Sequence, residues 1–406
     1  MENRIVISGM GITSAAGLGL KDFHDKIKNA PTDLSVKTEW EEEELSSSFS
    51  YALPDFKIKQ YYTNLRPPFP LRYSKIAMMG CLDAYQNADI ENLDIDPGRI
   101  GLILNSTFGA NAASEVYLTK LYSRGPRRVS PFKFTKTVSN SALGDISRYF
   151  KLRGVSSFLQ GENSICYGFD LLKENKADIV LCGGFDEVRD NIYLLYNEKG
   201  FLLPSHSDVE ETPLNIMNSQ LQKHRNDKKV IFGEGAAFLV LERLENALKR
   251  KAKIYAEVVN YASITDLNYS NYIFERSADS YFHAMKICLE NANAKPEEID
   301  TVVGAACLPW QFEEYEKGAF ENLFGSNGIN YTTIKPFIGE TFGSSGQASA
   351  IGAILMLNDK QLYGKGLETH LFNSYKNHSK EPDQVIVNSI HSGGNTTSVL
   401  LRKFEV

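Results

Sequence analysis

A strand-to-helix turn near the middle of the chain constrains the fold more than any other stretch. It begins with the apolar residues Phe158 and Leu159, continues through residues 160–163, and enters an apolar helix at about Ser164. A second apolar run, residues 177–184, follows and ends in two glycines. This succession of strand, helix and strand predicts a β-α-β unit, the building block of α/β folds.

Turns of this kind carry the nucleophile in many enzymes, because the positive end of the helix lowers the pKa of a thiol placed there. Here the turn consists of Gln160, Gly161, Glu162 and Asn163, and it contains no cysteine. Cys166 follows about one turn inside the predicted helix, and we expect it to be a buried structural thiol. We interpret the stretch as an active-site scaffold that lacks its nucleophile.

Alternating strands and helices are predicted along the whole chain, which favours an α/β fold with mostly parallel sheets. Two predicted helices, residues 137–150 and 345–357, are rich in small residues and are expected to pack closely between layers. Residues 193–225 read as a loop. The two halves, 1–250 and 251–406, look like copies of one plan that form a single integrated unit.

Composition narrows the class of protein. The chain has 406 residues, 42% of them hydrophobic and 23% charged, which is typical of a soluble globular protein. A net charge of -6 argues against general binding to nucleic acid or to anionic membranes. No signal peptide or membrane span is recognised, and the five cysteines are scattered without a CxxC pair. We therefore expect a cytoplasmic protein without disulfides, metal or cofactor.

Several segments, in their order and spacing, resemble the β-ketoacyl synthases of the thiolase superfamily. These segments are residues 4–13, 126–132, 232–242, 252–259 and 393–394. The resemblance implies a duplicated five-layered α/β/α/β/α fold with five-stranded sheets. It also implies a decarboxylative condensation, in which a cysteine takes the acyl chain from a carrier protein, two histidines stabilise developing negative charge, and a lysine supports the second histidine.

The chain departs from that family at each catalytic position but one. Gln160 takes the place of the nucleophile, and Glu340 replaces the second histidine while Lys335 is retained. No histidine lies between His283 and His370, the interval in which both are expected. The glycine-rich loop of residues 391–394 also lacks its gating phenylalanine.

This pattern is similar to that of the chain length factor, the non-condensing partner of the ketosynthase in type II polyketide synthases. The resemblance implies a heterodimer with a catalytic ketosynthase, contact with an acyl carrier protein, and a share in the tunnel that limits chain growth. An aromatic polyketide and a conjugated polyene both stay open as products. Tunnel-lining positions are predicted at Phe108, Asn111 and Phe134. Contact with the partner or the carrier is predicted at Arg124, Arg127, Arg128 and Lys133.

Two other functions stay open. The chain is an autonomous acyltransferase or hydrolase that uses Cys166, Glu340 and His391, or it is a homodimeric protein without catalysis. For His391 the favoured interpretation is a loop histidine with a structural hydrogen bond. Lys335 and Glu340 can form a buried ion pair that fills the site or can carry chemistry, and a lone buried carboxylate requires such a partner.

Overall fold

The computed structural model describes residues 3–29, 50–62, 64–66, 69–204, 229–267, 275–325, 329–359, 362 and 381–405. Within these residues the strands form one ten-stranded sheet in the order β10-β9-β11-β12-β8-β1-β7-β5-β3-β4. The strands of its first half are β1 (Ile5–Thr13), β3 (Ile100–Asn105), β4 (Ser156–Leu159), β5 (Ile179–Asp186) and β7 (Gly235–Arg243). Those of its second half are β8 (Ala256–Thr265), β9 (Thr301–Val303), β10 (Asn330–Thr332), β11 (Gln384–His391) and β12 (Asn395–Arg402).

The sheet is mixed. Of the nine pairings, the five in the middle are antiparallel and the two at each end are parallel. The prediction of a mostly parallel sheet is therefore wrong for the central strands. The error arises because β7, β8 and β12 return through the middle of the sheet, which the alternation of elements does not reveal.

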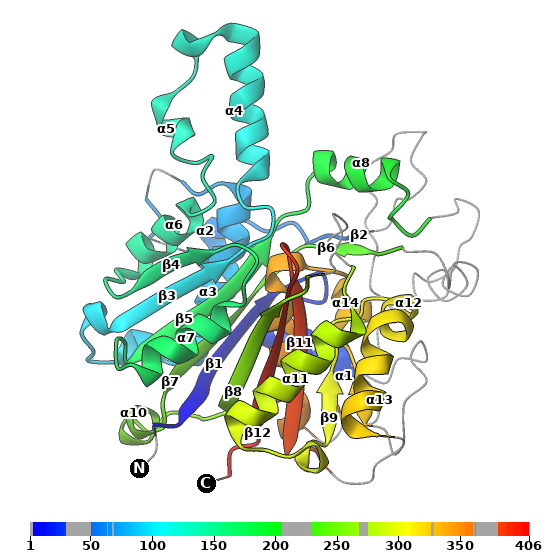
Figure 1. Cartoon of the computed structure of the whole chain (residues 1–406). Helices are drawn as coiled ribbons and strands as arrows, with labels where there is room; N and C mark the ends of the chain where they lie inside the picture. The colour runs from blue at the N-terminus through cyan, green and yellow to red at the C-terminus, as the bar shows by residue number, and fades with distance from the viewer. Residues whose placement is uncertain are drawn as a thin grey trace.

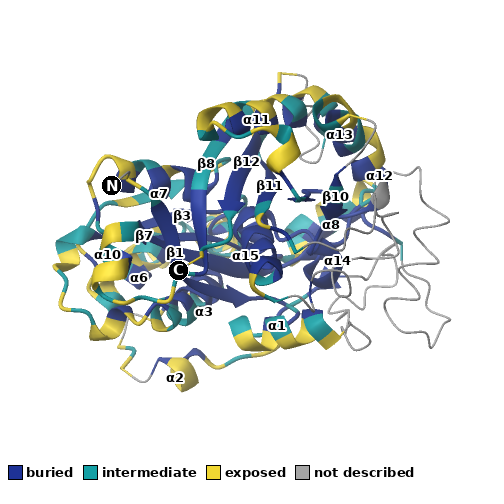
Figure 2. Cartoon of the chain, turned by 90° about the horizontal axis from the view of Figure 1, so that it is seen from below, coloured by how far each residue is buried: buried dark blue, intermediate teal, exposed yellow. Residues whose placement is uncertain are grey.

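The two halves of the sheet meet where β1 pairs with β8, from Ile5 opposite Val258 to Ile7 opposite Ala256. Every residue of β1 is buried, so this junction lies in the core (Figure 2). A division of the chain near residue 250 stays a prediction.

Two helices, both labelled in Figure 2, pack between the halves and form the central layer. They are α7 (Ser164–Lys173) and α15 (Ser345–Asn358), and each packs on strands of both halves. In α15 every residue except Leu355 and Asn358 is buried. Its small residues permit this, since a Cβ on Gly352 would lie 2.4 Å from the Cγ2 atom of Ile334.

Outer helices cover the other faces and complete the five layers (Figure 1). The first half carries α3 (Arg72–Asn87) and α6 (Ser141–Phe150), and the second carries α11 (Ala278–Ala292) and α13 (Lys317–Phe324). A π-helical turn, Phe312–Glu316, leads from the short helix α12 (Pro309–Gln311) into α13. A further outer helix, α1 (Leu20–Asn29), packs against β1, and α10 (Leu244–Lys249) follows β7.

Some predicted elements differ from those observed. The predicted helix 137–150 begins only at Ser141, and the predicted loop from residue 193 starts instead within helix α8 (Asp190–Glu198). Residues 205–225 of that loop lie outside the described residues. The segment that precedes β7 forms the short strand β6 (Phe232–Gly233), which pairs with β2 (Ser50–Tyr51).

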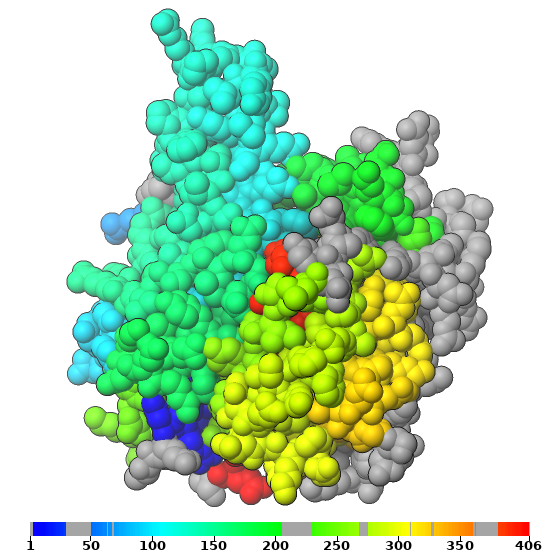
Figure 3. All heavy atoms as spheres, viewed as in Figure 1, coloured from blue at the N-terminus to red at the C-terminus, as the bar shows by residue number. Residues whose placement is uncertain are grey.

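A projection rises from the body of the molecule (Figures 1 and 3). It consists of α4 (Asn111–Arg124), the 3-10 turn Pro126–Arg128 and α5 (Pro131–Phe134). No residue of α4 is buried. Large apolar side chains are exposed on the projection and just after it, at Val116, Leu118, Tyr122, Phe132, Phe134 and Val138.

Candidate functional site

The turn between β4 and α7, called the elbow below, ends in a capped helix. Asn163 is the N-cap residue, and its Oδ1 atom accepts a hydrogen bond of 3.0 Å from the amide of Ile165. Gly161 has a φ of +78°, and a Cβ there would lie 2.4 Å from the carbonyl oxygen of Ser392. The elbow is therefore packed directly against the glycine-rich loop that follows β11.

Gln160 does not stand at the helix N-terminus. Its side chain is exposed, and its Nε2 atom donates to the carbonyl of Thr107 at 3.3 Å. The buried positions at the start of α7 belong to Asn163 and Ser164. That Gln160 occupies the position of the lost nucleophile stays a prediction. The side chains buried inside the elbow are those of Asn163 and Ser164.

A buried polar network surrounds the start of α7. The Nε2 atom of Gln347 donates to Asn105 Oδ1 at 2.6 Å, to Ser164 Oγ at 2.7 Å and to Asn163 Oδ1 at 3.2 Å. Asn163 in turn donates from Nδ2 to Ser389 Oγ at 3.3 Å. The sequence analysis missed this network. One signal was present, since Gln347 is the one long polar side chain at the start of an otherwise small and apolar helix.

Lys335 and Glu340 form a buried ion pair. Lys335 Nζ lies 2.5 Å from Glu340 Oε2, and the two side chains are 2% and 3% exposed. The other carboxylate oxygen of Glu340 accepts the amide of Phe342 at 2.9 Å and the hydroxyl of Ser345. Both oxygens of Glu340 are thus occupied, and the ion-pair arrangement that the sequence left open is the one observed.

His391 is buried at the end of β11. Its Nε2 atom lies 3.1 Å from Ser389 Oγ, and Arg276 donates to its backbone carbonyl. Burial, with further contributions from Arg276 and Lys335, lowers the pKa of the imidazole to about 3. The ring is therefore neutral at neutral pH. Among the described residues no carboxylate bonds to its other ring nitrogen, so a complete acid–base triad is not formed.

The cysteines do not act as replacements for the nucleophile. Cys166 is buried, and desolvation, followed by the charges of Glu162 and Asp170, raises the pKa of its thiol well above the usual range. Within the described part of the chain it bonds to neither His391 nor Glu340. Burial likewise raises the pKa of Cys307 to about 12. The structure does not bring together the groups that an autonomous enzyme would need.

Asp186, at the end of β5, ties the elbow region to the second half. Its carboxylate accepts hydrogen bonds from the hydroxyl of Ser106 and from the amides of Thr107, Phe108 and Gly343, at 2.6–2.9 Å. Desolvation nevertheless outweighs these bonds and raises the pKa of Asp186 to about 6. The sequence analysis did not single out this residue.

Of the three predicted tunnel positions, Phe108 lies beside the elbow, and Asn111 and Phe134 lie on the projection. Phe108 packs edge-to-face on Phe342, with ring centroids 4.6 Å apart. Asn111 begins α4, and its Nδ2 atom donates to Asn191 Oδ1 at 3.3 Å. Phe134 lies on the projection, is 56% exposed, and has its ring centroid 5.7 Å from that of Tyr117. A lining role for each stays a prediction.

The four predicted contact residues share the projection. Arg124 ends α4, Arg127 and Arg128 lie in the 3-10 turn, and Lys133 lies in α5. All four are exposed. The structure therefore places them together beside exposed apolar side chains and away from the elbow.

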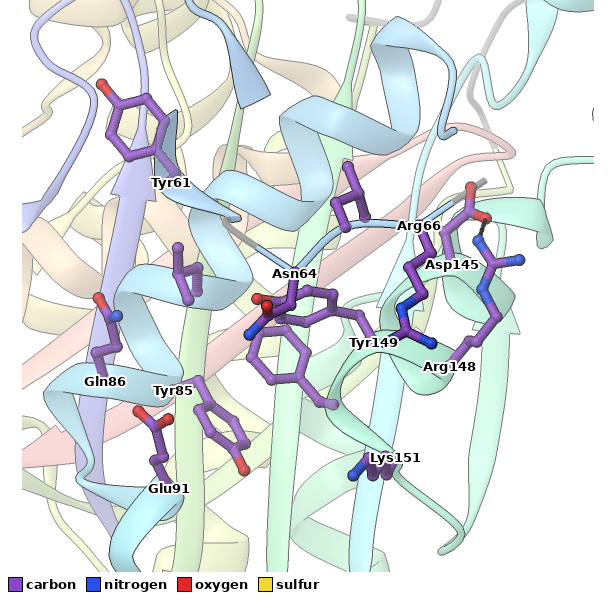
Figure 4. A pocket seen from close by; sticks show the side chains of 13 residues that line it. Tyr61, Asn64, Arg66, Tyr85, Gln86, Glu91, Asp145, Arg148, Tyr149 and Lys151 are labelled. Atoms are coloured by element: carbon purple, nitrogen blue, oxygen red, sulfur yellow. Dashed lines mark hydrogen bonds and ion pairs between the residues drawn. The ribbon is translucent and has the colours of Figure 1, made fainter. Parts of the chain in front are cut away.

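A surface groove of about 870 Å³ lies elsewhere, on the outer face of the first half (Figure 4). Its walls come from α3, from α6 and the residue after it, from Glu91, and from Tyr61 and residues 64–66. Aromatic rings of Tyr85 and Tyr149 line it, together with Arg66, Arg148 and Glu91. It contains none of the elbow residues.

The arrangement of the layers and of the elbow can now be compared with known proteins. The sequence matches the description "Beta-ketoacyl synthase, N-terminal domain" over residues 2–247 and "Beta-ketoacyl synthase, C-terminal domain" over residues 255–365. The chain belongs to the β-ketoacyl synthase family. Its relatives include 3-oxoacyl-(acyl-carrier-protein) synthase 2 of Staphylococcus aureus (strain N315), which is 25% identical over 89% of this chain and 87% of that protein. The protein of the same name from Rhizobium meliloti (strain 1021) is 26% identical over 99% of both.

Solved structures show the same thiolase-like fold. "The ishigamide ketosynthase/chain length factor" superposes with a TM-score of 0.81 at 20% identity and covers all of both chains. A type II PKS acyl-carrier protein in complex with its ketosynthase gives a TM-score of 0.80 at 18% identity, also over all of both chains. At these identities the likeness concerns the fold, so function must be argued from the site.

Within the described residues, no group of three or more His, Cys, Asp or Glu side chains is placed to hold a metal ion. No helix in that part of the chain is long and apolar enough to cross a membrane.

Proposed function

We propose that this member of the β-ketoacyl synthase family is a non-condensing subunit of the chain length factor type. It pairs with a catalytic ketosynthase, meets an acyl carrier protein, and helps to shape the tunnel in which a polyketide grows. The observation that carries the proposal is the start of α7, where Asn163 and Ser164 take the cap and first positions and the one thiol of the first turn, Cys166, is buried. Condensation by this family's chemistry requires a thiolate at that point.

The remaining site also supports a non-condensing role. The position of the second histidine holds Glu340, a carboxylate whose two oxygens are already bonded to Lys335, Phe342 and Ser345. An anionic group there opposes the negative charge that develops when a malonyl thioester loses carbon dioxide. The site thus offers an acceptor, already paired with Lys335, where condensation needs a hydrogen-bond donor.

Two surfaces favour pairing with another subunit. Strand β4 pairs with β3 on one side only within the described residues, so its outer edge has backbone groups available to a further strand. The projection adds exposed apolar side chains such as Val116 and Tyr122, which are 59% and 84% exposed. Arg127 and Arg128 beside them supply the positive charge that suits an acidic carrier protein or partner.

Co-expression with a ketosynthase encoded beside this protein tests the proposal. We expect the two chains to co-purify at a one-to-one ratio and to form polyketide from malonyl-loaded carrier protein. Neither subunit is expected to do so alone, and this chain is expected to gain no acyl group from acyl-carrier protein. The cytoplasm is the expected compartment. Labelling of this chain at Cys166, with condensation in the absence of a partner, would refute the proposal.

Ser389 and His391 are the closest approach to a hydrolytic pair, because their Oγ and Nε2 atoms lie 3.1 Å apart. The same assay therefore includes a measurement of thioester hydrolysis, with His391→Asn as its control. Hydrolysis by the native chain that the variant loses would favour the autonomous enzyme. A stable homodimer that ignores the ketosynthase would favour the homodimeric protein.

A further inference from the structure

Phe108 and Phe342 lie against each other beside the elbow, although they come from different halves of the chain. Their ring centroids are 4.6 Å apart in an edge-to-face arrangement, and Phe342 packs on Phe232 at 4.8 Å with its other side. Phe342 is 4% exposed. The residue before Phe108, Thr107, accepts the hydrogen bond from Gln160, so the ring pair lies next to the elbow.

Phe342 is held in an unfavourable backbone conformation. Its φ is +51°, a left-handed value that a bulky side chain rarely adopts. Such a conformation persists only where the surroundings enforce it. The residue that follows, Gly343, is also fixed, because its amide donates to Asp186 Oδ2 at 2.7 Å.

A buried carboxylate holds the backbone of each phenylalanine. Glu340 Oε1 accepts the amide of Phe342 at 2.9 Å, and Asp186 Oδ1 accepts the amide of Phe108 at 2.9 Å. Lys335 fixes the other oxygen of Glu340. Both acids are at most 3% exposed, so these bonds are shielded from water and strong.

We propose that Glu340 is a positioning residue that locks Phe342 against Phe108, and that this ring pair fills the space beside the elbow so that no acyl chain can lie there. The inference rests on the proposed function and adds a specificity-determining element to it. This subunit excludes the acyl chain from its own vestigial site, and the growing polyketide is left to the site of the partner. The role of Glu340 is then steric and conformational.

Ring removal in the isolated chain tests the plug without any partner. Phe342→Ala and Phe108→Ala are expected to open an apolar space, because Phe342 is buried, Phe108 is partly buried against it, and truncation of such rings leaves unfilled volume. The probe is decanoyl-pantetheine, and binding is measured by calorimetry. We expect each variant to bind it at least about tenfold more tightly than the native chain, as burial of two or three methylenes provides.

The matched control is Phe320→Ala, since Phe320 is 5% exposed and belongs to an aromatic cluster in the outer helix α13. It loses a ring of the same size at a distance from the elbow and is expected to bind the probe as the native chain does. Equal binding by all four proteins, each folded by circular dichroism, would overturn the inference.

A second pair of variants tests the part played by Glu340. Lys335→Met with Glu340→Gln removes both charges but keeps an oxygen that can accept the amide of Phe342, whereas Lys335→Met with Glu340→Met removes the acceptor as well. We expect the methionine pair to bind the probe and the glutamine pair to resemble the native chain. Equal probe binding by the two would show that Glu340 does not position Phe342.

The two proposals can fail separately. Failure to pair with a ketosynthase would refute the proposed function and leave the probe measurements unaffected. Where the heterodimer forms, Phe342→Ala is expected to change the distribution of product lengths and Phe320→Ala to preserve it. A product distribution unchanged by Phe342→Ala, in a heterodimer that is active, would show that the plug does not determine specificity.

Discussion

The elbow and the projection differ in which side chains they bury. The elbow buries polar side chains, whereas the projection exposes apolar ones. Around the elbow, buried polar groups such as Gln347, Asn163 and Glu340 bond to other groups of the same chain. Gln347 Oε1 is an exception, a buried oxygen without a hydrogen-bond partner. On the projection, by contrast, large apolar side chains are exposed and no residue of α4 is buried.

This difference indicates that the elbow contributes mainly to the stability of the chain and the projection mainly to binding another molecule. Apart from Gln347 Oε1, the buried polar groups named around the elbow bond within the chain, so they contribute to its folding and offer little to a substrate. The exposed surface of the projection contributes little to folding and has apolar area that only another molecule can cover. Substitutions in the first region should therefore change stability, and substitutions in the second should change association.

The largest loss of stability is expected from Lys335→Ala. This variant leaves Glu340 buried without its counter-ion, which typically costs about 3–5 kcal/mol. Urea unfolding of the isolated chain measures it. Lys317→Ala is the matched control, because Lys317 forms a partly exposed pair with Glu313 at 2.9 Å and its removal costs at most about 1 kcal/mol. Similar losses of unfolding free energy in the two variants would contradict the claim that burial makes the Lys335–Glu340 pair costly to break.

Low pH should weaken the elbow region through His391. The pKa of this buried imidazole is lowered to about 3 in the folded chain, against 6.5 when unfolded. The unfolded chain therefore binds the extra proton first, and stability present above pH 6.5 is lost as the pH falls toward 3, on the order of 3 kcal/mol of it by pH 4.

The measurement is the difference in unfolding free energy between the native chain and His391→Asn from pH 7 to pH 4. We expect the advantage of the native chain to shrink as the pH falls. Burial raises the pKa values of Asp83 and Asp186 to about 6. Their contribution to the stability of the folded chain therefore changes in the opposite sense, because it is lost as the pH rises from about 4 to 6. Both proteins contain them, so their effect cancels in the difference. A constant difference would show that His391 is not buried in its neutral form.

A smaller loss is expected from Asn163→Ala, which removes the cap of α7 and the bond to Ser389. Loss of an N-cap costs about 1–2 kcal/mol. Asn163→Asp keeps the capping oxygen and should recover part of that loss in a thermal unfolding measurement. If aspartate and alanine were equally destabilising, the cap would not be the main contribution of Asn163.

The smallest change in stability is expected on the projection, where the comparison is sharpest. Tyr122→Ser alters a side chain that is 84% exposed and should change the unfolding free energy by less than about 0.5 kcal/mol. The same substitution should reduce co-purification with the ketosynthase. Leu248→Ser is the control, because Leu248 is 52% exposed on α10, far along the chain from the projection. A loss of pairing with both variants would indicate a general effect of added polarity.

Much of the central architecture was predictable because it depends on local patterns. The apolar run that became β5, the helix α7 behind its turn and the small-residue helix α15 all lie where periodicity and composition place them. The pairing of Lys335 with Glu340 was also within reach, since the two are five residues apart and a buried carboxylate needs a partner.

Other features depend on contacts between distant segments and left no local signal. The antiparallel pairings of β7, β8 and β12 follow from the path of the chain across the sheet. The four bonds accepted by Asp186 join three separate segments, and the low pKa of His391 results from burial by many elements at once.

The sequence by itself determined the family, the alternation of strands and helices, and the absence of a cysteine from the elbow, because each depends on residue identity and spacing along the chain. Only the tertiary structure decided that Asn163 and Ser164 stand at the start of α7 while Gln160 is exposed. It also decided that Phe342 lies against Phe108 and that its amide donates to Glu340. The physical reason is that burial and hydrogen-bond partners are properties of the packed layers, which bring together residues from both halves of the chain.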